Sequence, residues 1–98
     1  MSLKFRKKPI VVEAVQWHQH GDHPFVERGR KRPDGTVGDD ASIGRWSSNF
    51  PSIAVIKTWE GWYEVTSGDW IITGVKGEHY PCKPDIFLMT YEPVEGDT

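Results

Sequence analysis

Apolar and polar positions divide the chain into two patterned stretches with a long polar stretch between them. Residues 10–17 read Ile-Val-Val-Glu-Ala-Val-Gln-Trp, a run of β-branched and aromatic side chains without a breaker. Pro9 suits the start of a strand, where a missing N–H is least costly. We therefore expect a largely buried strand from about residue 8 to Trp17.

The second half of the chain alternates short apolar segments with turns. Strands are predicted at residues 53–59, 62–65, 70–73 and 78–80, with turns at 60–61, 66–69 and 74–77. Gly61 supplies the positive φ of a tight hairpin, and Asp69 is expected to cap its own turn. This spacing of about ten residues predicts an antiparallel meander, as in small barrels and rolls.

The C-terminal part predicts one short helix. Pro84 and Asp85 open it, and it continues through Met89. Residues 90–94 are expected to form a last edge strand that Pro93 blunts, and residues 95–98 form a frayed tail. Together these elements predict a mainly β fold (α+β at most) in one small domain spanning residues 1–98.

Residues 18–49 form the long polar stretch, which is rich in glycine and contains the turn signal Pro33-Asp34-Gly35. A structureless loop of this length is uncommon in a compact domain, so the stretch is either mobile or contains short elements. Residues 25–28 fit either one helical turn or a strand fragment. Loops of this kind often carry binding function.

Aromatic residues are abundant for a chain of 98 residues, with five Trp, four Phe and three Tyr. Large rings build a core from few positions, so five tryptophans exceed what one small core requires. One or more of them is expected at an interface; the alternative is that all five pack inside. An unpaired sheet edge and surplus rings are also compatible with a homodimer.

Charge is unevenly distributed, since residues 1–32 carry a net charge of +5 and the remainder −7. Two basic segments account for this, Lys4 to Lys8 and the group Arg28, Arg30, Lys31 and Arg32. With Trp17 and Trp46 they form a candidate binding set in which cations contact phosphates and rings stack on bases. The alternatives are a solvated surface, or two oppositely charged parts that attract each other within one fold.

Three histidines follow the first predicted strand in an H-x-H-x2-H pattern. His18 and His20 would point to one side of an extended chain, and with His23 they form a candidate site for Zn²⁺, Ni²⁺ or Cu²⁺. The pattern lacks a fourth ligand, so the alternative is a polar loop that happens to be rich in histidine.

Cys82 is the only cysteine and lies three residues after His79, before the predicted helix. This placement makes it a candidate nucleophile, although a cysteine between prolines is more often a small packing residue. The glycines near Asp69 and Lys76 match neither a P-loop nor a dinucleotide fingerprint, and no carboxylates have the spacing of a catalytic pair. No cofactor and no catalytic residue is predicted.

Several segments resemble a family of small phage and prophage proteins. The resemblance covers both ends of the chain and skips residues 18–49; it lies in residues 4–14, 16–17, 56–58, 60–61, 67–72, 74–78, 80–87 and 90–92. A Pro-Gly-Asp-Tyr-Gly turn marks the family, and here it reads Ser67-Gly68-Asp69-Trp70-Ile71. The resemblance implies a phage or prophage origin and a role dispensable to the host, and it implies no chemistry.

The first of two main hypotheses follows from these features: a non-enzymatic accessory protein that binds a host protein or a small anionic ligand. The second is a nucleic-acid-binding β domain that uses the basic segments. An enzyme acting through Cys82 or a metal on the histidines ranks third. We expect a cytoplasmic protein without membrane contact, since neither a leader nor a long apolar run is seen.

Overall fold

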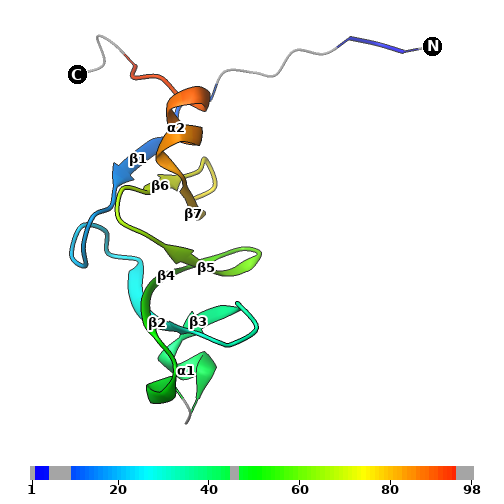
Figure 1. Cartoon of the computed structure of the whole chain (residues 1–98). Coiled ribbons are helices and arrows are strands. Elements are labelled where there is room, and N and C mark those ends of the chain that lie inside the picture. Colours follow the sequence, from blue (N-terminus) through cyan, green and yellow to red (C-terminus); the bar gives the residue numbers. More distant parts are fainter. Residues whose placement is uncertain (1, 5–9, 45–46, 95–98) are drawn as a thin grey trace.

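The computed structural model describes residues 2–4, 10–44 and 47–94 and shows a mainly β protein with two antiparallel sheets (Figure 1). The three-stranded sheet has the order β1-β6-β7, formed by Glu13–Gln16, Trp70–Thr73 and His79–Cys82. The four-stranded sheet has the order β3-β2-β4-β5, formed by Val37–Asp39, Val26–Lys31, Ser52–Thr58 and Gly61–Val65. The helices are α1 (Asp40–Ile43), the 3-10 turn η1 (Ser47–Asn49) and α2 (Pro84–Thr90). The predicted fold class, mainly β with a short C-terminal helix, is confirmed.

The hairpin between β4 and β5 forms where the sequence predicts it. Gly61 has a φ of 120°, which only glycine adopts without strain, and Thr58 lies opposite it in the ladder. The Thr58 hydroxyl accepts a hydrogen bond from the Glu60 N–H at 3.0 Å and donates one to the Gly61 carbonyl at 2.9 Å. Local turn chemistry therefore fixes this register.

The chain changes sheets after this hairpin, which corrects the predicted continuous meander. Among the described residues β5 pairs with β4 alone, whereas β6 pairs with β1 on one side and β7 on the other. The turn at residues 66–69 makes the crossing, and Asp69 caps it as predicted. Its Oδ2 accepts hydrogen bonds from the Thr66 N–H at 2.9 Å and the Thr66 hydroxyl at 3.2 Å.

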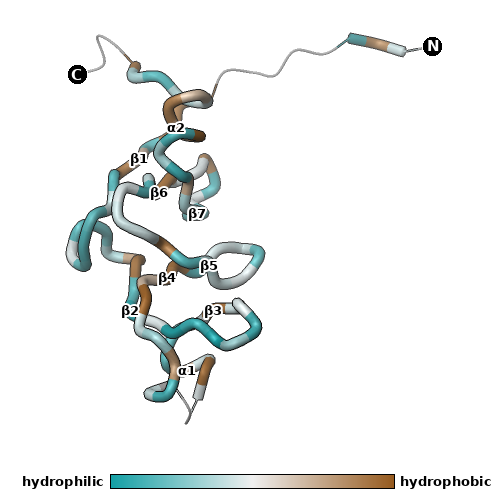
Figure 2. Tube along the Cα trace, viewed as in Figure 1, coloured by the Kyte–Doolittle hydropathy of each residue, from teal (hydrophilic) through white to brown (hydrophobic). Residues whose placement is uncertain are grey.

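The main core lies between the two sheets and is small. It is formed by Trp17, Val26, Ala54, Ile56, Val65 and Ile71, and Trp17 is only 5% exposed. Trp17 joins this core because its N–H donates to the Asp69 carbonyl at 2.7 Å, which extends the β1–β6 ladder by one residue. Figure 2 shows the hydrophobic colour along β4 and again at α2, toward the end of the molecule opposite α1.

One of the sheets is curled into a half-barrel, and a glycine lets the four-stranded sheet curl. Gly29 of β2 is buried, and a Cβ placed there would collide with the Gly38 carbonyl oxygen and lie 2.7 Å from Cγ2 of Val55. The curl brings the edge strands β3 and β5 into contact. Across β4, the Lys31 Nζ of β2 reaches a Glu64 carboxylate oxygen of β5 at 3.3 Å.

The polar stretch at residues 18–49 contains the short elements β2, β3, α1 and η1. Of the two interpretations offered for residues 25–28, the strand is correct, since β2 begins at Val26. Charged side chains hide this strand from a hydrophobicity pattern, because its solvent-facing positions carry Glu27, Arg28 and Lys31.

Two predicted strands differ from the structure. The first is shorter than expected and is not buried: β1 covers only residues 13–16, and Val11 before it is 68% exposed. The last predicted strand, at residues 90–94, is wrong, because α2 continues to Thr90 and residues 91–94 adopt no strand. The tail predicted at residues 95–98 lies outside the described residues.

Candidate functional site

Most of the predicted basic binding residues already have partners within the fold. The Arg30 Nε lies 3.3 Å from Asp40 Oδ1, and its Nη1 donates to the Phe50 carbonyl at 3.0 Å. Arg32 donates to the Thr36 hydroxyl and the Ser42 carbonyl, and Lys31 pairs with Glu64. Of the four predicted basic residues, only Arg28 is exposed and makes no such bond to the described part of the chain. The basic strand therefore offers little free positive charge.

The structure places one of the two tryptophans of the predicted binding set, and that one is not on the surface. Trp17 is in the core, and Trp46 lies outside the described residues. Trp59 is 71% exposed at the turn of the β4–β5 hairpin. Trp70 is half-buried under α2, and its indole stacks on Phe87 at 4.2 Å between ring centroids. The prediction that a tryptophan is surface-exposed is thus met by Trp59.

The three histidines of the predicted metal site do not converge. His20 packs edge-on against Trp17, whereas the buried His23 contacts Phe25 and His79. Across residues 2–4, 10–44 and 47–94, no three His, Cys, Asp or Glu side chains are placed to hold a metal ion. The geometry therefore does not support a metal site at His18, His20 and His23. Gly21, with a φ of 106°, turns the chain between His20 and His23.

His23 makes the stability of the fold depend on pH. Burial lowers the pKa of His23 below its ordinary value of 6.5, and the adjacent His79 lowers it further. Its Nδ1 accepts a hydrogen bond from the Phe25 N–H at 3.1 Å, which requires an unprotonated Nδ1. The unfolded chain therefore binds a proton more readily than the folded one at this residue.

Stability is accordingly expected to fall as the pH drops below about 6.5 and to be fully retained above it. We predict a lower melting temperature at about pH 5 than at about pH 8. His23→Asn keeps an acceptor for the Phe25 N–H and should flatten this dependence. The same pH profile in both proteins would show that His23 is not the group responsible.

Cys82 lacks the surroundings of a nucleophile. Burial raises the pKa of its thiol above the ordinary value, and Asp69 and Asp85 raise it further. His79 and Cys82 are three residues apart on β7, so their side chains point to opposite faces of the sheet. The Cys82 thiol instead lies 3.7 Å from the Lys83 carbonyl oxygen. These contacts disfavour a thiolate at neutral pH.

Helix α2 contacts the three-stranded sheet through an aromatic side chain. Pro84 occupies its first turn, and Phe87 and Tyr91 stack on each other with centroids 5.2 Å apart. Phe87 also stacks on Trp70 of β6. No residue of α2 is fully buried, and Leu88 and Met89 are 74% and 82% exposed. The helix thus carries apolar side chains all round, as an interaction surface does.

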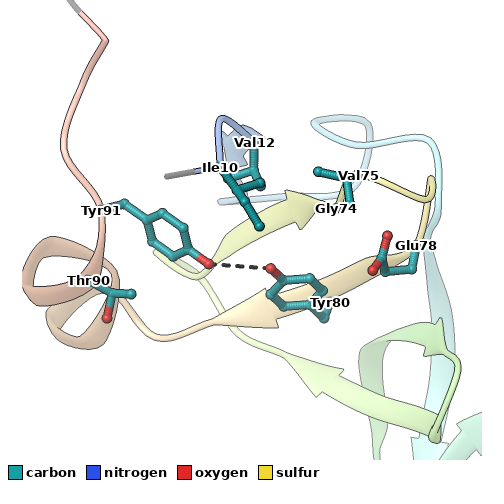
Figure 3. A pocket seen from close by; sticks show the side chains of 8 residues that line it. All are labelled: Ile10, Val12, Gly74, Val75, Glu78, Tyr80, Thr90 and Tyr91. Atoms are coloured by element: carbon teal, nitrogen blue, oxygen red, sulfur yellow. Dashed lines mark hydrogen bonds between the residues drawn. The ribbon is translucent and has the colours of Figure 1, made fainter. Parts of the chain in front are cut away.

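An apolar groove of about 620 Å³ runs between α2 and the start of β1; we call it the α2 groove. Its walls are chiefly Ile10, Val12, Ala14, Trp70, Phe87 and Leu88. A smaller hollow of about 390 Å³ adjoins it and shares Ile10, Val12 and Tyr91 with it (Figure 3). Both volumes lie within the range of ligand sites, about 300–1,000 Å³.

The polar groups of these hollows are neutral hydroxyls and carboxylates. Figure 3 shows Tyr80 and Tyr91 pointing toward each other, with their hydroxyl oxygens 3.3 Å apart. Burial, followed by this hydrogen bond, raises the pKa of Tyr80 to about 12, so its hydroxyl stays protonated at neutral pH. Glu13, Glu78 and Glu92 are the charged residues of the lining. The site is apolar with an acidic rim.

Sequence reasoning missed this groove, because it forms where residues 10–14 meet residues 87–94, far apart along the chain. The sequence of the helix did point to an exposed apolar surface, because Ile86, Leu88 and Met89 leave a helix of this length without a polar face. The exposure of the apolar run at Ile10 and Val11 required the structure.

Comparison with known proteins finds no matching family model, no matching curated protein and no matching solved structure. Function is therefore inferred from the geometry of the site. Among the described residues, no helix is both long and apolar enough to cross a bilayer.

Proposed function

We propose that this chain is a non-enzymatic phage or prophage accessory protein that acts by binding a host protein, and that the α2 groove is its binding surface. The observation that carries the proposal is an open apolar groove framed by Leu88 and the run from Ile10 to Val12. Apolar surface of this kind on a small protein marks an interaction site more often than a solvated face. The resemblance to phage proteins supports the origin.

The chemistry of the groove indicates what kind of segment it accepts. Trp70 and Phe87 line the groove with a pair of stacked aromatic rings, and Leu88 lines it with an aliphatic side chain. Glu13 and Glu92 add negative charge at the rim. A partner segment with alternating apolar and basic residues satisfies both features, since aromatic anchors give affinity and complementary charges give specificity.

The same charges disfavour the other binding hypotheses. A small anion would meet Glu13, Glu78 and Glu92 at the hollows. A nucleic acid would have to compete with Asp40 and Glu64 for Arg30 and Lys31. Raised pKa values disfavour a thiolate at Cys82 and a phenolate at Tyr80 at neutral pH, which favours binding over catalysis by these two groups.

Selection from a library of random short peptides tests the proposal with a defined probe. We expect the protein to enrich peptides in which apolar residues alternate with Lys or Arg. Leu88→Lys should weaken their binding at least about tenfold, because it removes an apolar wall and repels the basic residues.

Met89→Lys is the matched control, since Met89 is the next residue on α2, is even more exposed and does not line the groove. It should leave the affinity unchanged. Equal loss in both variants, or selection of acidic peptides, would contradict the proposal.

A further inference from the structure

The two outer strands of the three-stranded sheet differ in how open their edges are. β7 carries Pro81, which has no N–H and blunts that edge against further pairing. β1 has no proline within Glu13–Gln16, and its Val15 is exposed. The only charge on β1 is Glu13. No strand of the described residues pairs with the outer side of β1, so this free edge is suited to pair with another strand.

The ladder shows which backbone groups of β1 face outward. The Trp17 N–H bonds to the Asp69 carbonyl on the β6 side. Residues of an antiparallel strand direct their backbone groups alternately to the two sides, so Val15 also bonds toward β6. Ala14 and Gln16 direct their N–H and C=O groups to the free edge. Val12 precedes β1, and pairing with a second strand would extend the same alternation to it.

We propose that a second copy of this chain binds at this edge, with the two β1 strands antiparallel about a two-fold axis and Ala14 opposite Ala14 of the second copy. Residues whose backbone groups face outward must lie opposite each other in the two β1 strands. The two-fold axis must therefore pass through a residue and not between two residues. An axis at Glu13 would set two carboxylates opposite each other, a destabilising pair. An axis at Ala14 sets Glu13 opposite Val15 of the second copy.

This register also uses the outward groups of Val12, Ala14 and Gln16, whereas an axis at Val15 uses only those of Ala14 and Gln16. Pairing turns two sheets of three short strands into one sheet of six. Sheets of only a few short strands gain the most from such extension.

The dimer places one α2 groove on each side of the axis. Each groove is bordered by β1 of its own chain, and the second copy adds its β1 beside it. A closed two-fold dimer is the commonest assembly of identical chains and requires the self-complementary edge described above. Dimerisation does not depend on the proposed function, because the groove can bind a peptide in one chain alone.

Cysteine cross-linking tests both the dimer and its register in the full chain. In a Cys82→Ser background, Ala14→Cys places two thiols on a hydrogen-bonded pair whose Cα atoms are about 5.5 Å apart, within disulfide range. Mild oxidation should convert most chains to covalent dimers. Gln16→Cys is the matched control, since it lies on the same open edge but opposite Val12 of the second copy, and it should cross-link far less.

Sedimentation of the unsubstituted protein is the second measurement, and it should give twice the mass of one chain. A single-chain mass at every concentration would overturn the proposal. Equal cross-linking at Ala14→Cys and Gln16→Cys, or preferential cross-linking by Val15→Cys, would overturn the register. Because peptide binding is measured separately, failure of the dimer and failure of the proposed function are distinguishable.

Discussion

Replacement of Asp69 by alanine is expected to lower the free energy of unfolding by about 2–3 kcal/mol. Asp69 is only 1% exposed, and its Oδ2 accepts from the Thr66 N–H, the Thr66 hydroxyl and the Lys83 Nζ. Alanine leaves the turn N–H without its partner. The loss stays below that of a fully buried ion pair, because Lys83 is 57% exposed and Oδ1 has no partner among the described residues.

Asp69 also bears on the binding surface. Lys83, its ion-pair partner, is the N-cap residue of α2, so the carboxylate links the crossing between the two sheets to the start of the helix. Asp69→Asn retains an acceptor for Thr66 and should cost less than Asp69→Ala. Urea denaturation of both variants measures the difference.

Asp34 supplies the matched control for this prediction. Its Oδ1 accepts from the Thr36 N–H at 2.9 Å and the Thr36 hydroxyl at 2.7 Å, the same pair of donors in an exposed turn. Asp34→Ala should therefore cost far less than Asp69→Ala. Equal losses would show that the burial of Asp69 is unimportant.

Replacement of Gly29 by alanine is expected to destabilise the protein by about 3 kcal/mol. The new Cβ would collide with the Gly38 carbonyl oxygen and approach both methyl groups of Val55, at 2.7 and 2.9 Å. The backbone oxygen cannot move away without opening the β2–β3 ladder, in which Gly29 pairs with Asp39. Thermal unfolding should show a clear drop in melting temperature.

Gly38→Ala is the control, because the close atom there is the Ser42 hydroxyl oxygen, the end of a side chain that can rotate. We expect a smaller loss, and Gly38→Ala combined with Ser42→Ala should remove the steric part of it. If Gly29→Ala were as mild as Gly38→Ala, tight closure of the half-barrel would not be required for stability.

The sequence predicts those parts of the fold whose causes are local. Gly61 requires a positive φ, Asp69 bonds within its own turn and Pro84 opens a helix, so each is visible in a few consecutive residues. β2 was predicted only as one of two alternatives for residues 25–28, because Gly29 and Arg30 occupy its interior and its strand character depends on pairing with β4.

The candidate site could not be predicted from the sequence, for a different reason. The basic strand was predicted as a binding surface, yet Asp40 and Glu64 reach Arg30 and Lys31 only after the chain folds. The α2 groove likewise requires Ile10 and Val12 to lie beside Phe87 and Leu88. A charge or an apolar residue can be counted in a sequence, but its partner is set by tertiary structure.

Backbone amide NMR during titration with a selected peptide tests whether the α2 groove is the binding surface. We expect the chemical shifts of residues 10–14 and 87–91 to change first, and those of the basic strand at Arg28 and Arg30 to stay constant. Shifts that concentrate in β2, with none along β1 and α2, would contradict the assignment of the α2 groove as the binding surface.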